Sequence, residues 1–434
     1  DLHAKAGPLP LAGLLDGFSI PPGADGMLEA SITVKGRGPD WRSWTPSGWV
    51  HVRRGKVTVE GVRDSLREVS LRLQAAGRDV MIERLAFKIG DSDVRIQGIV
   101  KEWASKPAPT LTLESSKLDI TRLIPIDRGA EEGGGALERI RQWALSGRAE
   151  VTALVKQAQY HRLRFRTLSG HLHVGAGKAE FGQLNGETPE GNFSGRVVAA
   201  LTSQRPIGIE AEMKIDGMPV HQILSIIDPE TEPLRGFLSL TGMLQGTIQG
   251  TSPFLGTLNS LAPMQFRLDK GRVLHGTVLP KVLKVLNVPA LLKGKVDLDH
   301  DGIPFDSVTA TVTVLDGVLT SRNIVFDSPL MKVTGAGTLD LPADELDLAL
   351  AVSPLGAYSD LIGKIPLFGT LLAGDRPGLS TALFEVKGPR TDPDVRYLPI
   401  KSIAKGLTGY PRLAIDVLTN VLALPGKLLS PDSP

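Results

Sequence analysis

The stretch from Asp297 to Gly302 has the residue types of a calcium-binding loop. Its sequence, Asp-Leu-Asp-His-Asp-Gly, sets carboxylates at alternate positions ahead of a turn glycine. The twelfth position of such a loop supplies a bidentate Glu, but Val308 stands there and begins an alternating strand pattern. We therefore expect no metal site here and a strand from this point onward.

Histidines are the other residues with metal-binding or catalytic chemistry. His171 and His173 share one face of a predicted strand, with His161 upstream, and neutral imidazole is a zinc ligand. No third ligand stands at a recognisable spacing, so we predict two solvent-facing histidines. The segment 191–195 (GNFSG) lacks the spacing of a nucleophile elbow, and no phosphate-binding or dinucleotide-binding loop is present. The prediction is a protein that is not an enzyme, with no catalytic residue, metal or cofactor; an envelope hydrolase that uses the histidine pair is a distant alternative.

Composition narrows the classes of protein further. The 434 residues include 49 Lys and Arg against 47 Asp and Glu, a balance that argues against a nucleic-acid partner. Cysteine is absent, which excludes disulfides and thiolate metal sites. With 48 Gly, 31 Pro and only 5% aromatic residues, the chain is expected to form many short elements separated by turns, and not a helical bundle. The sequence contains no run of 18 or more uncharged apolar residues, so no transmembrane helix is predicted.

Strict alternation of apolar and polar residues is the dominant pattern. It is clear in Val69–Gln74, Ile207–Ile215, Val308–Val314 and Leu346–Val352. Successive side chains of a strand point to opposite faces, so each stretch has one apolar and one solvated face. This pattern is typical of antiparallel sheet with a single solvated side. We therefore predict a mainly β fold built on a long, curved antiparallel sheet with one continuous apolar face.

Helical patterns are few in this sequence. One arrangement of a strand and a short apolar segment is repeated along the chain. Helices are expected at Ala136–Leu145, at Val278–Leu292 and after Pro411. An apolar strand followed by a short apolar segment occurs three times: 107–113 with 118–124, 206–209 with 220–227, and 346–350 with 358–362. Such a degenerate repeat predicts an elongated structure in which neighbouring units bury each other's faces.

The apolar face would consist mainly of Leu, Ile, Val and Ala. Such a surface suits acyl chains, because apolar burial depends on area and has little directional preference. Each buried CH₂ contributes roughly 0.8 kcal/mol. A closed β-sandwich core has the same periodicity, so alternation alone leaves both interpretations open.

The segment from about Gly276 to Pro399 contains an ordered set of motifs. They are LKVLNV at 283–288, DGIPFD at 301–306, LDGVL at 315–319, VTGAGTLDL at 333–341, IPLFGTLLAG at 365–374, VKGP at 386–389 and DPDV at 392–395. In this order they resemble the C-terminal portion of the AsmA-like family, most closely its YhdP-like branch. The resemblance covers somewhat over a quarter of the chain.

The resemblance implies a bacterial bridge-like lipid-transfer protein. Its sheet would form a U-shaped hydrophobic groove that carries phospholipid tails through the periplasm, between the inner and outer membranes. It also implies an inner-membrane anchor ahead of these residues. The expected parts are β-groove segments 1–135 and 136–233, an AsmA-like β region 234–398 with inserted short helices, and an amphipathic helical tail 399–434.

Two sets of residues are the candidate contacts. The candidate lipid-binding residues, each with a conventional core position as its alternative, are Leu71, Leu73, Phe87, Ile96, Leu111, Ile209, Val312, Val314, Leu339, Leu348 and Leu350. The candidate membrane-contact residues of the tail, which would dock on a membrane surface or close the groove end, are Leu413, Ile415, Val417, Leu418, Val421 and Leu422. Phospholipids, the two membrane surfaces and envelope proteins are the expected partners. The alternative function is a periplasmic scaffold that receives β-strands during outer-membrane protein assembly.

Overall fold

The computed structural model describes residues 2–11, 24–36, 45–58, 64–123, 143–201, 207–227, 232–249, 252–274, 278–285, 302–354, 369–371, 379–398 and 417. Two compact units divide the chain, residues 1–211 and 212–434. Their boundary falls inside strand β15 (Ile207–Pro219). The finer division at 135/136, 233/234 and 398/399 stays a prediction.

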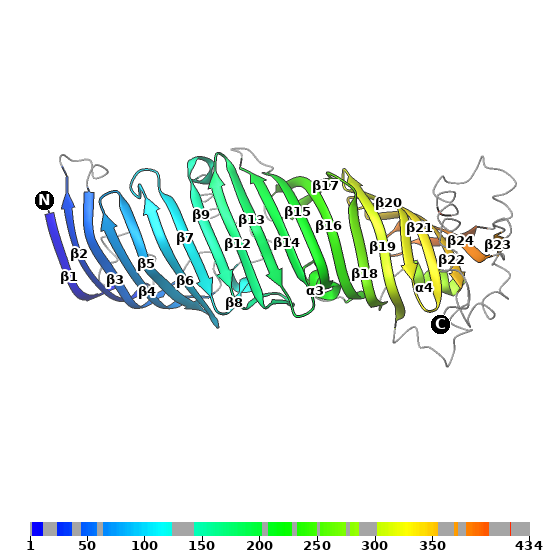
Figure 1. Ribbon diagram of the computed structural model, residues 1–434, viewed down its shortest axis with the longest axis horizontal. Helices are drawn as coiled ribbons and strands as arrows, with labels where there is room; N and C mark the ends of the chain where they lie inside the picture. The colour runs from blue at the N-terminus through cyan, green and yellow to red at the C-terminus, as the bar shows by residue number, and fades with distance from the viewer. Residues whose placement is uncertain are drawn as a thin grey trace. The chain divides into compact units, whose positions relative to one another are not determined.

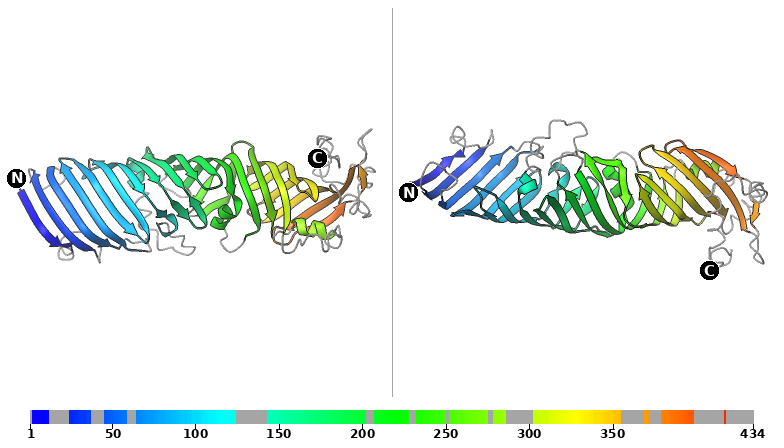
Figure 2. Two further views of the ribbon diagram at one scale, coloured as in Figure 1. Left: turned by 60° about the horizontal axis from the view of Figure 1, so that its bottom comes forward. Right: turned by 90° about the horizontal axis from the view of Figure 1, so that it is seen from above.

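The first unit is built on one large sheet (Figure 1). The strands pair in sequence order, and the sheet is curved and does not close on itself (Figure 2). They are β1 (Leu2–Pro10), β2 (Asp25–Lys35), β3 (Thr45–Val57), β4 (Leu66–Ala76), β5 (Asp79–Ile89), β6 (Ser92–Lys101), β7 (Ala108–Ser115), β9 (Ala149–Val155), β12 (Thr167–Gly175), β13 (Lys178–Glu187) and β14 (Asn192–Ala200). The predicted mainly β fold with a large, curved sheet is confirmed.

One pair of neighbours in this sheet is not antiparallel. Strands β7 and β9 run parallel, with Leu111 opposite Val151 and Leu113 opposite Ala153. Parallel neighbours need a crossover connection, because the chain must return to the same end of the sheet. The crossover contains β8 (Leu118–Asp119) and the one-turn helix α1 (Ile120–Leu123). Strand β8 also joins β10 (Ala158–Tyr160) and β11 (Leu163–Phe165) in a small second sheet.

The second unit holds a sheet of the same kind. Its pairings run from β16 to β18, β19, β20, β21, β22, β24 and β25, all antiparallel, with β17 on the far part of β16 and β23 on the start of β24. The bounds are β16 (Leu234–Gln249), β17 (Ser252–Ser260), β18 (Met264–Val273), β19 (Ile303–Leu315), β20 (Val318–Asp327), β21 (Met331–Asp340), β22 (Glu345–Pro354), β23 (Gly369–Leu371), β24 (Leu379–Pro389) and β25 (Asp394–Leu398). Helices α3 (Val220–Ile227) and α4 (Val278–Val285) belong to this unit.

The two helices of the second unit close a hydrophobic core over its sheet. Val220 of α3 and Val282 and Leu283 of α4 pack with sheet residues that include Phe305 and Phe384. Phe384, Val282 and Leu283 are among the largest side chains that are fully buried. Each helix has its apolar residues at helical spacing, so one face is available for the sheet. The apolar face is thus covered by the protein itself here.

The predicted helices are partly confirmed. The prediction at Val278–Leu292 corresponds to α4, which ends at Val285, and residues 286–292 lie outside the described residues. Of Ala136–Leu145 the structure describes only the last turn, where residues 143–146 are helical. The short apolar segments after the first two repeat strands form α1 and α3, and the third, at 358–362, is not described.

Candidate functional site

The apolar positions of the first-unit sheet line up from strand to strand. One row of direct cross-strand partners runs Val52, Leu71, Leu85, Ile96, Leu113, and the next runs Val50, Leu73, Ile82, Gly98, Leu111. Direct partners in a sheet share a face. The candidate residues Leu71, Leu73, Phe87, Ile96 and Leu111 therefore all lie on one face, which we call the first-unit apolar face.

The first-unit apolar face is free of charge over a long distance. Among the described residues, its paired positions from β2 to β14 carry no Asp, Glu, Lys or Arg. The opposite face carries charged side chains such as Arg53, Lys88 and Glu180. The sheet thus separates a hydrocarbon side from a polar side without interruption.

Side chains on the first-unit apolar face are only half-buried. Leu71, Leu73, Leu85, Ile96 and Leu111 all keep part of their surface accessible, unlike core residues. Phe181 on β13, between Leu172 and Val197, is 42% exposed. Described residues cover part of this face farther along the sheet: Ala144 of the helical turn at 143–146 packs with Ala149 and Val174, and the Phe165 ring of β11 lies 5.6 Å from the Phe193 ring of β14.

One end of this face is closed. Val69, Ile89 and Val94 are buried where β4, β5 and β6 end or begin. Strand β8 lies beside this end, and the Asp119 backbone N–H donates to Ser92 Oγ at 2.9 Å. The crossover that makes β7 and β9 parallel therefore also covers the adjacent edge of the apolar face.

The size of the open face sets its energetic importance. Ten strands at roughly 4.8 Å spacing and about seven residues each give an area on the order of 1,000 Å². Monomeric proteins rarely expose contiguous apolar patches larger than a few hundred Å². Because the side chains are already half-buried, covering the face would remove only part of this area from water, at about 25 cal/mol for each Å² removed. The arrangement therefore indicates a surface that binds apolar material.

The candidate tail contacts of the second unit differ in their environment. Val314 and Leu350 are 5% and 6% exposed, and Leu350 belongs to the core under α3 and α4. Val312 and Leu339 are half-buried, and Leu348 packs against the edge of that core. For Leu350 the structure therefore shows a conventional core position. Ile209 on β15 is half-buried and alternates with the exposed Glu210, as the sequence predicts.

The predicted membrane-contact helix is described only at Val417. This residue is helical and fully buried, packed with Ala336, Ala349 and Leu383 of the second unit. Val417 is thus corrected from a membrane contact to a packing residue, because the sheet already covers its side chain. Leu413, Ile415, Leu418, Val421 and Leu422 lie outside the described residues.

Ile82 and Phe181 are among the residues of the first-unit apolar face that were not predicted. Ile82 pairs with Leu73, but a bulge at Glu83 and Arg84 shifts the alternation from even to odd positions along β5. Phe181 sits before a similar register shift between Phe181 and Leu184 on β13. A bulge places two residues opposite one and so breaks the two-residue period. A change of phase within one strand was the signal that would have found both residues.

The histidine pair lies on the polar side of β12, as predicted. His171 Nδ1 is 3.1 Å from Thr152 Oγ1, and His173 Nδ1 is 3.8 Å from Glu150 Oε1. No three His, Asp or Glu residues of the described chain are placed to hold a metal ion together. The stretch from Asp297 to Asp301 lies outside the described residues, so its chemistry stays a prediction.

Polar-face charges around β13 form local pairs. Arg196 Nε donates to Glu180 Oε1 at 2.6 Å, and this hydrogen bond lowers the pKa of the Glu180 carboxyl below its usual value. Both groups are exposed, and ion pairs of this kind contribute little to stability. Their effect is to keep this side of the sheet hydrated while the other side stays apolar.

Comparisons with protein families, with curated proteins and with solved structures give no match for this chain. Within the described residues, none of the helices has the length and hydrophobicity needed to cross a bilayer.

Proposed function

We propose that this protein is a lipid-transfer conduit that carries phospholipid acyl chains along a hydrophobic β-groove. The first-unit apolar face supplies the surface for the tails, and the headgroups stay in water. The supporting observation is a charge-free face of ten successive strands on which Leu71, Leu73, Ile96 and Leu111 remain half-buried. A sheet that only formed a sandwich core would bury these residues completely.

The mechanism is physical and has no covalent step. Tails gain about 0.8 kcal/mol for each CH₂ removed from water. Successive rows of Leu, Ile and Val present nearly the same surface, so a tail that moves by one strand exchanges one set of contacts for an equivalent set. The free energy therefore stays nearly level along the sheet, and no single side chain is essential.

The cellular setting follows from the resemblance to AsmA-like proteins. It indicates a bacterial periplasmic location, a bridge between inner and outer membranes, and an inner-membrane anchor in the full-length protein. Phospholipids are then the cargo, and the two membrane surfaces are the source and the destination. We therefore propose that the first-unit apolar face carries phospholipid in the periplasm, between the two membranes.

A second candidate function is favoured by the first strand. β1 lies at the end of the first-unit sheet and pairs with β2 (Figure 1). An end strand offers backbone N–H and C=O groups to an added strand. In this alternative function, the protein is a scaffold that receives β-strands of outer-membrane proteins during their assembly.

Mass spectrometry of organic extracts tests the proposal. Protein purified without added lipid from a bacterial envelope should release phospholipid in stoichiometric amounts, and a similarly sized soluble protein carried through the same steps should release none. Absence of lipid together with crosslinks between β1 and a barrel precursor would support the scaffold and contradict the conduit.

A further inference from the structure

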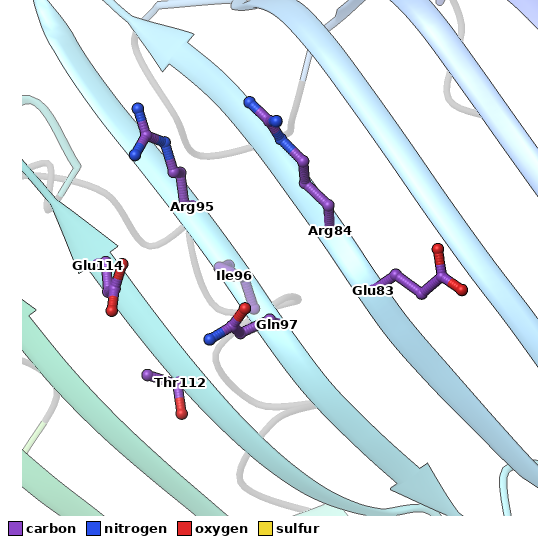
Figure 3. Close-up of a pocket in the computed structure, with 7 residues that line it drawn as sticks. All are labelled: Glu83, Arg84, Arg95, Ile96, Gln97, Thr112 and Glu114. Carbon is purple, nitrogen blue, oxygen red and sulfur yellow. The ribbon is translucent and has the colours of Figure 1, made fainter.

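A hollow of about 370 Å³ lies on the polar side of the first-unit sheet, across β5, β6 and β7. Ile96 lines it together with the polar residues Glu83, Arg84, Arg95, Gln97, Thr112 and Glu114. Figure 3 shows the polar side chains on the near side of the strands, with Ile96 behind the sheet. The hollow is therefore on the opposite side from the first-unit apolar face.

A β-bulge creates the hollow. On β5, Ile82 pairs with Gly98 and Leu85 with Ile96, so Glu83 and Arg84 together face the single residue Gln97. A bulge bends its strand and turns two adjacent side chains toward one side, and bulges are common beside functional sites. The short side chain of Thr112, paired with Gln97, leaves space on the next strand. The result is a depression with charged walls and a polar floor.

The charged groups around this hollow do not pair with one another. Arg95 lies directly opposite Glu114 in the register, yet neither side chain makes an ion pair or hydrogen bond with any described residue. Arg84 and Glu83 are unpaired in the same described part of the chain. Elsewhere on this side, Lys88 pairs with Glu68 at 2.8 Å. Arg72 and Lys101 of the same side also make no ion pair or hydrogen bond within the described residues, so the hollow is distinguished by the four charged side chains that line it together.

One of the two arginines, Arg84, also faces a like charge. Arg84 lies directly opposite Arg72 of β4, and like charges in direct cross-strand positions are unfavourable. Figure 3 shows the Arg84 and Arg95 side chains extending in the same direction from neighbouring strands. A bound anion would remove this repulsion and satisfy guanidinium groups from two strands at once.

The donors fit a tetrahedral oxyanion. A planar carboxylate is matched by the fork of one guanidinium, whereas a phosphate offers oxygens to two guanidiniums on different strands. Gln97 and Thr112 provide further donors at the floor.

We propose that this hollow binds a phosphate-bearing polar ligand, with the phosphate between Arg84 and Arg95. The site is separate from the lipid-tail surface, and the inference does not depend on the proposed function. The ligand is either a soluble phosphate ester or the headgroup of an anionic phospholipid in a membrane, because both present the same oxyanion.

The test compares both sources on the full chain. Thermal unfolding is followed with rising inorganic phosphate and glycerol 3-phosphate, and vesicle flotation is measured with phosphatidylglycerol against phosphatidylcholine. The variant is Arg84→Gln with Arg95→Gln, and the matched control is Arg53→Gln, an arginine of the same side that already pairs with Glu29. Folding of each variant is checked by circular dichroism.

Support takes one of two forms. A rise of the melting temperature with phosphate or glycerol 3-phosphate that the double variant loses, with affinity reduced about tenfold or more, indicates a soluble ester. Flotation that requires phosphatidylglycerol, Arg84 and Arg95, with no effect of the soluble compounds, indicates a lipid headgroup. Glu114→Gln, which keeps both arginines, should tighten binding in either case because it removes a negative charge beside the phosphate.

The proposal is overturned if neither probe binds the wild-type chain. It is equally overturned if the Arg53→Gln control weakens binding as much as the double variant, since binding would then reflect general surface charge. An unchanged or weaker affinity in Glu114→Gln would contradict the location of the phosphate even if the double variant failed to fold.

Discussion

Phe181 on β13 and Leu172 on β12 are direct cross-strand partners, and Phe181 remains 42% exposed. In the second unit Leu350 and Phe384 are partners of the same kind, and Phe384 is fully buried. The two pairs have the same chemistry and the same sheet geometry. They differ because α3 and α4 pack with the second pair and bury Phe384, whereas at the first pair Leu172 packs against the cluster of Ala144, from the helical turn at 143–146, and Phe181 stays exposed. This contrast is the basis for assigning lipid tails to the first unit.

A charge on the first-unit apolar face should reduce lipid loading. Leu73→Asp places a carboxylate between Val50 and Ile82, where an acyl chain would leave it unsolvated. We expect co-purified phospholipid to fall several-fold, measured by mass spectrometry of extracts from equal amounts of protein. Gln74→Asp is the matched control, because the adjacent side chain points to the polar side. Equal loss of lipid in both variants would show that the face does not matter.

Replacing Phe384 or Phe181 with alanine should show which ring lies in a closed core and which lies on an open surface. Phe384→Ala removes a fully buried ring and should lower the free energy of unfolding by about 3–5 kcal/mol. Phe181→Ala should cost about 1 kcal/mol or less, because much of the ring already contacts solvent. Urea denaturation of both variants measures this difference. A loss at Phe181 as large as at Phe384 would mean that the first-unit apolar face is a closed core.

Gly98 is required by the close approach of β7. Its φ of 149° is unfavourable for other residues, and a Cβ there would overlap the carbonyl oxygen of Thr110. Gly98→Ala should therefore destabilise the first unit by about 1–3 kcal/mol. Gly182→Ala is the control, since its Cβ would meet Glu180 at an ordinary 3.6 Å. If Gly98→Ala and the wild type gave the same denaturation curve, glycine would not be required at position 98.

Asp392 should titrate below its ordinary value. Lys281 of α4 donates to its carboxylate, which lowers the pKa of Asp392 from 3.8. The pKa of Asp392 is lower in the folded protein than in the unfolded chain. The ion pair therefore stabilises the fold fully at pH values above the unfolded pKa, and this stabilisation is lost as the pH falls through the folded pKa. NMR titration of the Asp392 carboxyl should give a midpoint below 3.8 that rises in Lys281→Gln. A midpoint unaffected by Lys281→Gln would show that the ion pair does not form in solution.

Alternation was enough to predict which side of a strand is apolar. Leu71, Leu73, Ile96 and Leu111 share one face because two-residue periodicity follows directly from strand geometry. Bulges limit this reasoning: Ile82 was missed because Glu83 and Arg84 shift the phase within β5. A local pattern reports the face only as far as the next bulge.

Covering elements could not be predicted from the same pattern. Leu350 alternates just as Leu71 does, but it lies under helices from distant parts of the sequence. The segments that became α1 and α3 are short and apolar, and periodicity does not distinguish such segments from strands. The parallel pairing of β7 and β9 likewise depends on a crossover and not on residues within either strand.

Site-specific photocrosslinking tests the central claim most directly. A photoreactive benzoylphenylalanine is placed at position 73 on the apolar face or at position 74 on the polar side, and each protein is irradiated after incubation with phospholipid vesicles. The proposed conduit predicts a covalent phospholipid adduct through the acyl chain at position 73 and none at position 74. No adduct at position 73, or equal adducts at both positions, would contradict it.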